Sequence, residues 1–412
     1  MPYRLYSSLP LGCENKNRAV IDTDALVANY RTLCAKTKRS VRPIAVVKAD
    51  AYGHGIPICV PALLREGCDF FAVASLPEAV AVRETVVREG ANADILIFGY
   101  TDPSDLPLLL RYDLIQTVFS REYGERLSNA AESEGARVRV HLAADTGMNR
   151  VGFGAYNEQS IEESACAVSQ LWKKGRLCIE GLFSHLFCAD EPQNAQAVSA
   201  TERQIERFGE LYRRLEKIGC PIALRHLCNS AGLLTHPKAH FEAVRLGVAL
   251  YGVSPIPDCP PLLPVMRLES RVVHLHTLLP GETVGYGGAF SADTPRLIAT
   301  LPIGYADGFL RAYRDAAEVS LYTAAGCFRV PVVGRICMDQ CMLDVTDTDA
   351  AIGDRAVLFG EAAEDSTRLA DAAGTIAYEV MTSISSRVER FAETKNCTAS
   401  PQKTRKEPRK CR

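Results

Sequence analysis

Short apolar runs alternate with longer amphipathic stretches through about the first 255 residues of the chain. The runs are rich in β-branched residues, which favour strands, and the stretches between them carry apolar residues at helical spacing. After a first segment at Ala19–Asp22, the expected strands are Ile44–Lys48, Phe70–Ala74, Ile95–Phe98, Ile115–Val118, Val138–Leu142, Ile179–Ser184, Leu224–Cys228 and Ala243–Leu246. Helix-like stretches between them include Pro77–Glu89, Arg121–Glu134, Glu158–Lys173 and Ala195–Ile218. This alternation predicts parallel strands, and eight repeats predict a (β/α)8 TIM-type barrel. An open doubly wound sheet is the alternative, but no Gly-rich dinucleotide fingerprint follows an early strand.

The pattern changes at the proline-rich stretch from Pro255 to Pro261, which is typical of a linker. Beyond it, short strand-like runs separated by turns predict a mostly-β domain. These runs are Arg271–Thr277, Leu297–Pro302, Val319–Tyr322, Phe328–Val333, Cys341–Val345 and Ala356–Phe359. One more helix-like segment, Ser366–Ile376, precedes Tyr378.

The expected domain organisation has three parts. Residues 16–255 form the barrel, and residues 256–392 form the β domain, on which the N-terminal segment 1–15 packs. Residues 393–412 form a basic tail. From Lys395 the tail has almost no apolar residue, so we expect it to be disordered.

Composition limits the classes of function. At 412 residues, with 47% hydrophobic and 23% charged residues, the chain suits a soluble two-domain protein. The net charge of −2 gives no reason to expect a nucleic acid or an anionic membrane as partner. No apolar run resembles a signal peptide or is long enough to span a bilayer, so we expect a cytoplasmic protein. The fifteen cysteines lack CxxC pairs and metal-ligand spacing, which predicts free thiols and no metal site.

Lys48 stands at the end of the first barrel strand, after the apolar run Ile44–Val47. A lysine at the mouth of an apolar cavity has a lowered pKa and therefore a usable amine. The alternative is a solvated lysine that caps a buried strand. Gly53 and Gly55, on either side of His54, allow the chain to turn back sharply and to pass close to a ligand.

Polar residues also follow later strands at their carboxyl ends, where (β/α)8 barrels hold their active sites. They are Asp145–Gly152 after the fifth strand, Ser184 and His185 after the sixth, Asn229 and Ser230 after the seventh, and Arg245–Val248 at the eighth. Each has an ordinary structural explanation, since a lone histidine is more often a core residue and Asn-Ser is common in turns. Their joint occurrence at successive strand ends predicts an active site.

The string Ala-Val-Val-Lys-Ala-Asp-Ala-Tyr-Gly-His-Gly, residues 45–55, resembles the cofactor-lysine segment of the alanine racemases. These are fold-type III enzymes that use pyridoxal 5′-phosphate (PLP). The strand-end motifs match the family in order and rough spacing, and the resemblance covers the chain from about Arg18 to Phe391. In the β domain it rests on Val284-Gly-Tyr286-Gly-Gly, Ile303-Gly-Tyr305-Ala-Asp-Gly, Val333-Gly-Arg-Ile-Cys-Met338-Asp339 and the segment from Ala377 to Arg387.

The resemblance implies that Lys48 carries PLP as a Schiff base and that Arg245 faces the pyridine nitrogen, which would suppress transamination. His185 would connect Arg245 to Tyr286. The phosphate would be held by Tyr52, Ser230, Tyr378 and the backbone at Gly247 and Val248. The full cofactor-binding set that it implies is Lys48, Tyr52, His185, Asn229, Ser230, Arg245, Gly247, Val248 and Tyr378.

The implied reaction is the interconversion of L-alanine and D-alanine by two bases, supplying D-alanine for peptidoglycan. Tyr286 of the partner subunit would take the proton from L-alanine, and Lys48 would take it from D-alanine. Arg150 would lie near the substrate carboxylate. Tyr305, Met338 and Asp339 would be substrate-binding residues from the partner subunit, so the resemblance implies a homodimer with shared sites.

The alternatives are a racemase for serine or another small amino acid, a fold-type III decarboxylase, and a non-enzymatic PLP-binding protein. The last resembles the barrel alone, whereas this chain also has the β domain and Tyr286. Tyr378 and Tyr305 favour alanine, because the resemblance places them at the pocket and its entrance.

The chain departs from the family at Ala143, two residues before Asp145. Many alanine racemases have there a lysine whose carbamylated amine positions the active-site arginine. Alanine cannot form a carbamate, so we expect chloride, a nearby carboxylate or water to face Arg150 instead.

Overall fold

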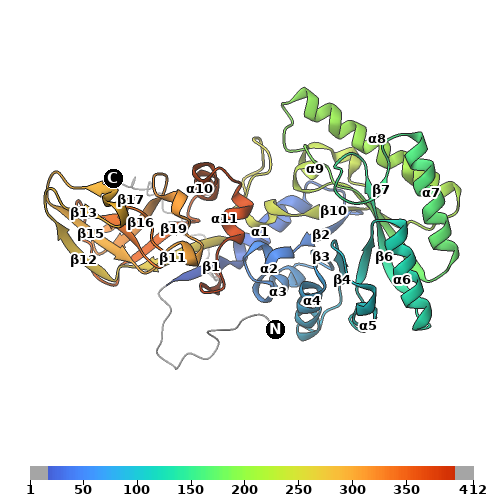
Figure 1. Ribbon diagram of the computed structural model, residues 1–412, viewed down its shortest axis with the longest axis horizontal. Helices are drawn as coiled ribbons and strands as arrows, with labels where there is room; N and C mark the ends of the chain where they lie inside the picture. The colour runs from blue at the N-terminus through green and yellow to red at the C-terminus, as the bar shows by residue number, and fades with distance from the viewer. Residues whose placement is uncertain (1–16, 395–412) are drawn as a thin grey trace, which may run out of the picture. The chain divides into compact units, whose positions relative to one another are not determined.

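The structure is a computed structural model that describes residues 17–394 (Figure 1). It divides into two compact units. The barrel unit consists of Leu26–Ala51 and Gly55–Leu262, and the β unit of residues 17–25, Tyr52–His54 and Leu263 to residue 394. The expected packing of residues 1–15 and the expected disorder from Lys395 onward lie outside the described residues.

The described residues of the barrel unit contain a closed barrel of eight parallel strands. In sequence order they are β2 (Arg42–Val46), β3 (Phe70–Val73), β4 (Asp94–Ile97), β5 (Ile115–Val118), β6 (Val138–Asp145), β8 (Leu177–Phe183), β9 (Leu224–His226) and β10 (Ala243–Leu246). β2 pairs with β10, and the β5–β6 pairing completes the ring. The short strand β7 (Phe153–Gly154) adds to β6. The predicted TIM-type barrel is therefore confirmed, and each of the eight expected strands overlaps one of these.

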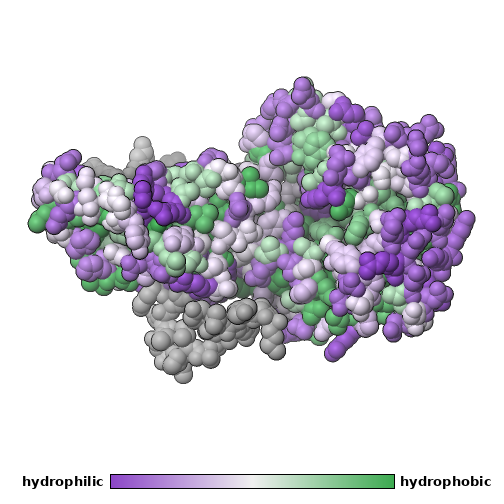
Figure 2. All heavy atoms as spheres, viewed as in Figure 1, coloured by the Kyte–Doolittle hydropathy of each residue, from purple (hydrophilic) through white to green (hydrophobic). Residues whose placement is uncertain are grey.

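Helices lie outside the barrel strands, as Figure 1 shows for α6, α7 and α8. The helices are α1 (Thr23–Cys34), α2 (Lys48–Tyr52), α3 (Ile56–Arg65), α4 (Leu76–Arg88), α5 (Leu106–Arg111), α6 (Arg121–Ser133), α7 (Glu158–Lys173), α8 (Ala195–Lys217) and α9 (Ser230–Thr235), with 3-10 turns η1 (Pro103–Asp105), η2 (Pro237–Ala239) and η3 (Val248–Tyr251). Local capping sets where several begin. Ser120 Oγ accepts from the Tyr123 amide before α6, and Asn157 accepts from the Ser160 amide before α7. Hydrophilic side chains gather over α6 and α7 on the face in Figure 2, whereas Leu127 of α6 and Leu171 of α7 are buried, so these helices are amphipathic.

The described part of the β unit contains one large sheet in the order β12-β15-β18-β17-β16-β19-β11-β1-β20. Its strands are β1 (Arg18–Asp22), β11 (Met266–Arg271), β12 (His274–Leu278), β15 (Arg296–Leu301), β16 (Glu318–Thr323), β17 (Gly326–Val333), β18 (Cys341–Asp344), β19 (Arg355–Phe359) and β20 (Glu389–Glu393). A small hairpin and short helical elements complete it: β13 (Thr283–Val284), β14 (Phe290–Ser291), η4 (Tyr286–Gly288), η5 (Tyr305–Asp307), η6 (Arg311–Tyr313), α10 (Asp365–Ala373) and α11 (Ala377–Thr382). The predicted mostly-β C-terminal domain is confirmed.

Two predicted elements of this unit have different bounds in the structure. The single strand expected at Arg271–Thr277 is two strands, because β11 pairs with β19 while β12 pairs with β15. The strand is interrupted at Val272 and Val273, where the chain passes from beside β19 to beside β15. The helix expected at Ser366–Ile376 ends at Ala373, because Gly374 adopts a left-handed conformation with φ of 66°, and a separate helix carries Tyr378.

The first strand, β1, belongs to the β unit and not to the barrel. It pairs antiparallel with β11 and parallel with β20, so both ends of the described chain meet in one sheet. Glu393, the first residue assigned to the tail, lies in β20. Among the described residues, no helix is both long and apolar enough to cross a membrane.

Candidate active site

Lys48 follows β2 at the carboxyl end of the barrel and begins an unusual turn. The next four residues, from Ala49 to Tyr52, are not glycine, yet they all have φ between 52° and 56°. A left-handed turn of such residues costs roughly 1–2 kcal/mol per residue, so other contacts must hold it. Glu78 Oε1 accepts from the Ala49 amide at 2.6 Å, and Asp50 Oδ1 accepts from the Ile56 amide at 2.7 Å. Lys48 is thus held on a strained segment anchored at both ends.

The surroundings of Lys48 favour an uncharged amine. Burial lowers the pKa of Lys48, and the nearby charges of Arg150 and Arg245 lower it further. Glu78 opposes this shift. Because the lowering influences dominate, Lys48 can act as a nucleophile or base more readily than a solvated lysine.

Arg245 is the most firmly held charged side chain near Lys48. It lies in β10 and is 3% exposed. Its Nη1 donates to the backbone oxygen of His226 at 2.5 Å and lies 3.0 Å from Nδ1 of the same residue. Its Nη2 donates to the backbone oxygens of Ser184 and Leu227 at 2.7 and 2.8 Å. The guanidinium is therefore fixed at the ends of β8 and β9, and it offers donors but no acceptor to any ligand that it faces.

His185 lies close to the same charges. Burial lowers its pKa to about 3, with further lowering by Arg245, Arg150 and Lys48. The imidazole is therefore neutral at pH 7. The structure thus brings together four of the predicted site residues in the barrel unit: Lys48, Arg150, His185 and Arg245.

Ser230, Gly247 and Val248 lie where β9 and β10 end. Ser230 Oγ accepts from the backbone amides of Gly247 and Ala249 at 3.0 and 3.4 Å. Asn229 caps α9 by accepting from the Gly232 amide at 2.9 Å, and its Nδ2 donates to the Leu186 backbone oxygen at 3.0 Å. A hydroxyl and backbone amides thus converge at this end of the barrel, which is the donor set that a phosphate group requires.

Tyr52 and Tyr378 are neighbours in the β unit, although they are far apart in sequence. Their ring centroids lie 6.1 Å apart. Gly53 is necessary for this approach, because a Cβ at that position would lie 2.4 Å from the Met381 backbone oxygen. Arg390 Nε also donates to the Gly53 oxygen at 3.0 Å. The two predicted phosphate-binding tyrosines are therefore held side by side.

The β unit also groups Tyr305, Met338 and Asp339. The amides of Tyr305 and Ala306 donate to the backbone oxygens of Cys337 and Met338 at 3.1 and 3.0 Å. Arg387 Nη2 lies 2.9 Å from Asp339 Oδ1 and its Nε lies 3.4 Å from Asp307 Oδ1, so Arg387 ties the two turns together.

Tyr286 lies at the start of η4 and is 69% exposed within one chain. Gly285 and Gly287, with φ of 71° and 70°, shape its turn. The described residues of one chain thus leave this side chain largely uncovered.

The exposure of Arg150 bears on the expectation about Ala143. Ala143 is buried at 2% exposure, but Arg150 is exposed within the chain. Because Arg150 is exposed in one chain, its guanidinium is not desolvated there, and what faces it stays a prediction. A requirement for an anion arises only if something covers Arg150.

Sequence reasoning missed His226, the imidazole that contacts Arg245 directly. It also missed His141, whose Nδ1 lies 3.0 Å from His226 Nε2. Each stands in a buried barrel strand, where a lone histidine has no distinguishing signal. Their placement in strands whose side chains point into a barrel was the one available indication.

These residues fit a phosphorylated carbonyl cofactor. An amine with a lowered pKa can bond to a carbonyl, the Ser230 site suits a phosphate, and Arg245 suits an acceptor atom of a ring.

Comparison with known proteins gives one consistent result. The family model "Alanine racemase, N-terminal domain" matches residues 21–255, and "Alanine racemase, C-terminal domain" matches residues 265–392. Alanine racemase 1 of Clostridium acetobutylicum is 40% identical over 380 residues, which cover 90% of this chain and 94% of that protein. Alanine racemase of Desulfosudis oleivorans is 38% identical, over 90% and 95% of the two chains.

Solved structures agree with the sequence comparisons. Alanine racemase of Clostridium difficile 630 superposes with a TM-score of 0.83 at 33% identity, covering 93% of this chain and 97% of that chain. Alanine racemase of Streptomyces coelicolor A3(2) superposes with a TM-score of 0.82 at 35% identity, covering 92% and 98%.

Proposed function

This chain belongs to the alanine racemase family and is an amino-acid racemase, and we propose that it interconverts L-alanine and D-alanine with PLP as its cofactor. The observation that carries the proposal is the Lys48 amine, whose pKa is lowered by burial and by Arg150 and Arg245 at the carboxyl end of the barrel. PLP supplies an electron sink that makes the Cα proton of a bound amino acid acidic. The remaining work belongs to residues of this chain.

Holding the cofactor is the work of groups at the strand ends. Lys48 would bind it covalently. Ser230, the amides of Gly247 and Val248, and the hydroxyls of Tyr52 and Tyr378 would hold its phosphate, with Asn229 keeping Ser230 in place. Arg245, which only donates, would face the ring nitrogen and keep it unprotonated.

Moving the proton requires one base on each face of the substrate. Lys48 is suited to one face because its amine is readily uncharged. Tyr286 of the partner subunit would serve the other face, in keeping with its 69% exposure in a single chain. His185, neutral with a pKa of about 3, would connect Arg245 to that tyrosine. Tyr286 would take the proton of L-alanine, and Lys48 that of D-alanine.

Binding the substrate is assigned to Arg150 and to a group from the second subunit. Arg150 would face the substrate carboxylate. Tyr305, Met338 and Asp339, which the Arg387 contacts hold together, would border the entrance from the other subunit. The proposal therefore includes a homodimer with shared active sites, and D-alanine for peptidoglycan as its product.

The test is made on the purified protein. With PLP bound, an absorbance band near 420 nm, typical of PLP joined to a lysine amine, should disappear on borohydride treatment and leave the label on Lys48. L-alanine should give D-alanine, and Lys48→Ala should abolish the reaction, with some recovery on adding methylamine. A Lys48→Ala protein with near-normal turnover and no added amine would refute the proposal. If the protein racemises serine and not alanine, the proposed substrate is wrong and serine takes its place.

A further inference from the structure

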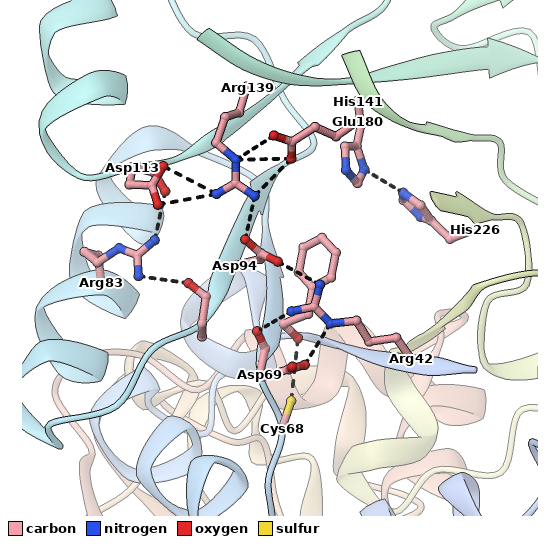
Figure 3. A network of polar contacts seen from close by, with 12 residues as sticks. Arg42, Cys68, Asp69, Arg83, Asp94, Asp113, Arg139, His141, Glu180 and His226 are labelled. Carbon is pink, nitrogen blue, oxygen red and sulfur yellow. Dashed lines mark hydrogen bonds and ion pairs between the residues drawn. The ribbon is translucent and has the colours of Figure 1, made fainter. Parts of the chain in front are cut away.

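Behind Arg245, inside the barrel, lie two buried histidines that the proposed reaction does not use. His226 is in β9 and His141 is in β6, and both are almost fully buried. His226 Nδ1 lies 3.0 Å from Arg245 Nη1, and His226 Nε2 lies 3.0 Å from His141 Nδ1. Figure 3 shows the two imidazoles facing each other. Arg245, His226 and His141 therefore form a continuous chain of polar contacts.

Hydrogen-bond chemistry determines the direction of this chain. A guanidinium can only donate, so His226 Nδ1 must be the acceptor and carry no proton. A neutral His226 then carries its proton on Nε2, which points at His141. His141 Nδ1 must in turn accept, which places the His141 proton on Nε2. The contacts thus select one tautomer for each imidazole.

Both rings are held in the neutral form and in fixed positions. Burial is the main cause that lowers the pKa of His141 to about 3 and that of His226 well below its usual value. The pairing of β6 with β8 shifts register between Val140 and His141, and this opposes His141 to Gly181. A Cβ at Gly181 would lie 2.6 Å from the His141 ring, so glycine is required there. His226 stacks on Phe183, with ring centroids 4.9 Å apart.

Charged groups near His141 are paired with one another. Arg139 Nη2 lies 2.7 Å from Asp94 Oδ1 and its Nε lies 2.9 Å from Glu180 Oε1, and Arg42 Nη1 lies 2.7 Å from Asp94 Oδ2 (Figure 3). These charged groups pair with one another. The direction of the hydrogen bonds between the two imidazoles is therefore determined by Arg245, which donates to His226.

We propose that His141 is a positioning residue that acts through His226 to fix the orientation of Arg245. His141 accepts the Nε2 proton of His226 and thereby favours the tautomer whose bare Nδ1 receives Arg245. The opposite tautomer would turn an N–H toward the guanidinium, two donors would face each other, and Arg245 would move. This inference rests on the proposed function, because the role of Arg245 is to face the cofactor.

Two variants of similar size separate the hydrogen bond from the packing. His141→Asn keeps an oxygen near the position of Nδ1 that can accept from His226, whereas His141→Leu has none. A third variant, His240→Leu, removes a buried histidine whose Nε2 contacts the Leu233 backbone oxygen at 2.8 Å, outside the chain of contacts. It controls for the loss of a buried imidazole.

The first readout is ¹⁵N NMR of the imidazoles, recorded with and without PLP. In the wild type, His226 should be protonated on Nε2 and bare on Nδ1. His141→Leu should shift the His226 signals or mix its tautomers, and His141→Asn should not. A wild-type His226 protonated on Nδ1, or a His141→Leu protein with unchanged His226 signals, would overturn the proposal.

The second readout is the cofactor itself. In the PLP-bound enzyme, His141→Leu should change the absorbance band and lower kcat about tenfold with less than threefold change in KM, the size expected for losing one hydrogen bond to a charged group. His141→Asn should stay within about threefold of the wild-type kcat, and His240→Leu should lower Tm without changing the band. If His141→Asn and His141→Leu lower kcat equally and leave the absorbance band unchanged, His141 contributes only packing and the proposal is refuted.

The two hypotheses fail differently. A wild-type protein that neither binds PLP nor racemises alanine would overturn the proposed function and, with it, the positioning role. His226 protonated on Nε2 in the PLP-free protein would still confirm the direction of the imidazole chain. If the wild type racemises alanine and the His141 variants change neither kcat, the absorbance band nor the His226 signals, only the positioning role is overturned.

Discussion

Ser230 Oγ accepts a hydrogen bond from the backbone amide of Gly247 at 3.0 Å. Ser230 begins α9 just beyond β9, and Gly247 directly follows the neighbouring strand β10. One hydroxyl therefore joins two adjacent strand ends at the point where a phosphate would bind. The contact keeps the Gly247 amide and the hydroxyl together at this edge of the barrel.

We expect Ser230→Ala to raise the dissociation constant of PLP about tenfold, because it removes one hydrogen-bonding group to an anion, worth roughly 1.5–3 kcal/mol. The measurement is a fluorescence titration of the PLP-free protein. Ser164→Ala is the matched control, since Ser164 is also buried and donates to the Gly154 backbone oxygen at 2.7 Å. If both variants weaken PLP binding equally, Ser230 does not contact the phosphate.

Lys48 should make stability depend on pH in the PLP-free protein. Its folded-state pKa lies below the ordinary value of 10.5, so between these values the unfolded chain binds a proton that the folded chain has released. The free energy of unfolding therefore rises with pH through that window. Lys48→Met should be more stable than the wild type below the window, and the difference should vanish near pH 10.5.

Urea denaturation from pH 7 to 10.5 measures this effect. Lys38→Met, at an exposed lysine, is the control and should show no such convergence with the wild type. A stability difference between Lys48→Met and the wild type that stays constant over the whole range would mean that Lys48 titrates as it does in the unfolded chain.

The proposed dimer should show complementation between inactive subunits. Lys48 belongs to the barrel unit and Tyr286 to the β unit, so Lys48→Ala and Tyr286→Phe impair different halves of a shared site. Mixing the two inactive proteins under subunit exchange should restore activity, because each heterodimer has one intact site. No recovery, with exchange verified by mass spectrometry, would place both residues of a site in the same subunit.

Because Ala143 replaces the lysine of many family members, we expect the effect of anions on activity to depend on which group faces Arg150. Activity should not change when bicarbonate is added, because the methyl side chain of Ala143 cannot form a carbamate. If a halide faces Arg150 in the dimer, replacing chloride by gluconate should raise the KM for alanine severalfold, since an unpaired guanidinium binds and orients the carboxylate less well. An unchanged KM would exclude chloride and leave water or a carboxylate, in keeping with the exposure of Arg150 in one chain.

The sequence by itself determined the barrel, the change to a β-rich domain and the positions of most candidate site residues. Those features are local. Apolar runs such as Phe70–Val73 identify buried parallel strands, and Ser230 or Arg245 could be placed because each lies at a strand end. The motif around Lys48 added the chemistry through its resemblance to a family.

Only the tertiary structure decided which distant segments meet. β1 pairs with β20, so Arg18 lies opposite Glu389, 371 positions later in the chain, because pairing depends on the whole sheet and not on the local pattern. The left-handed turn from Ala49 to Tyr52 contradicts the local preference of its residues, and the tertiary contact of Glu78 with the Ala49 amide helps to hold it. His141 and His226 show the same limit. A buried histidine has no distinguishing signal in a strand sequence, and its hydrogen-bonding direction is set only when the closed barrel brings its nitrogens against specific neighbours.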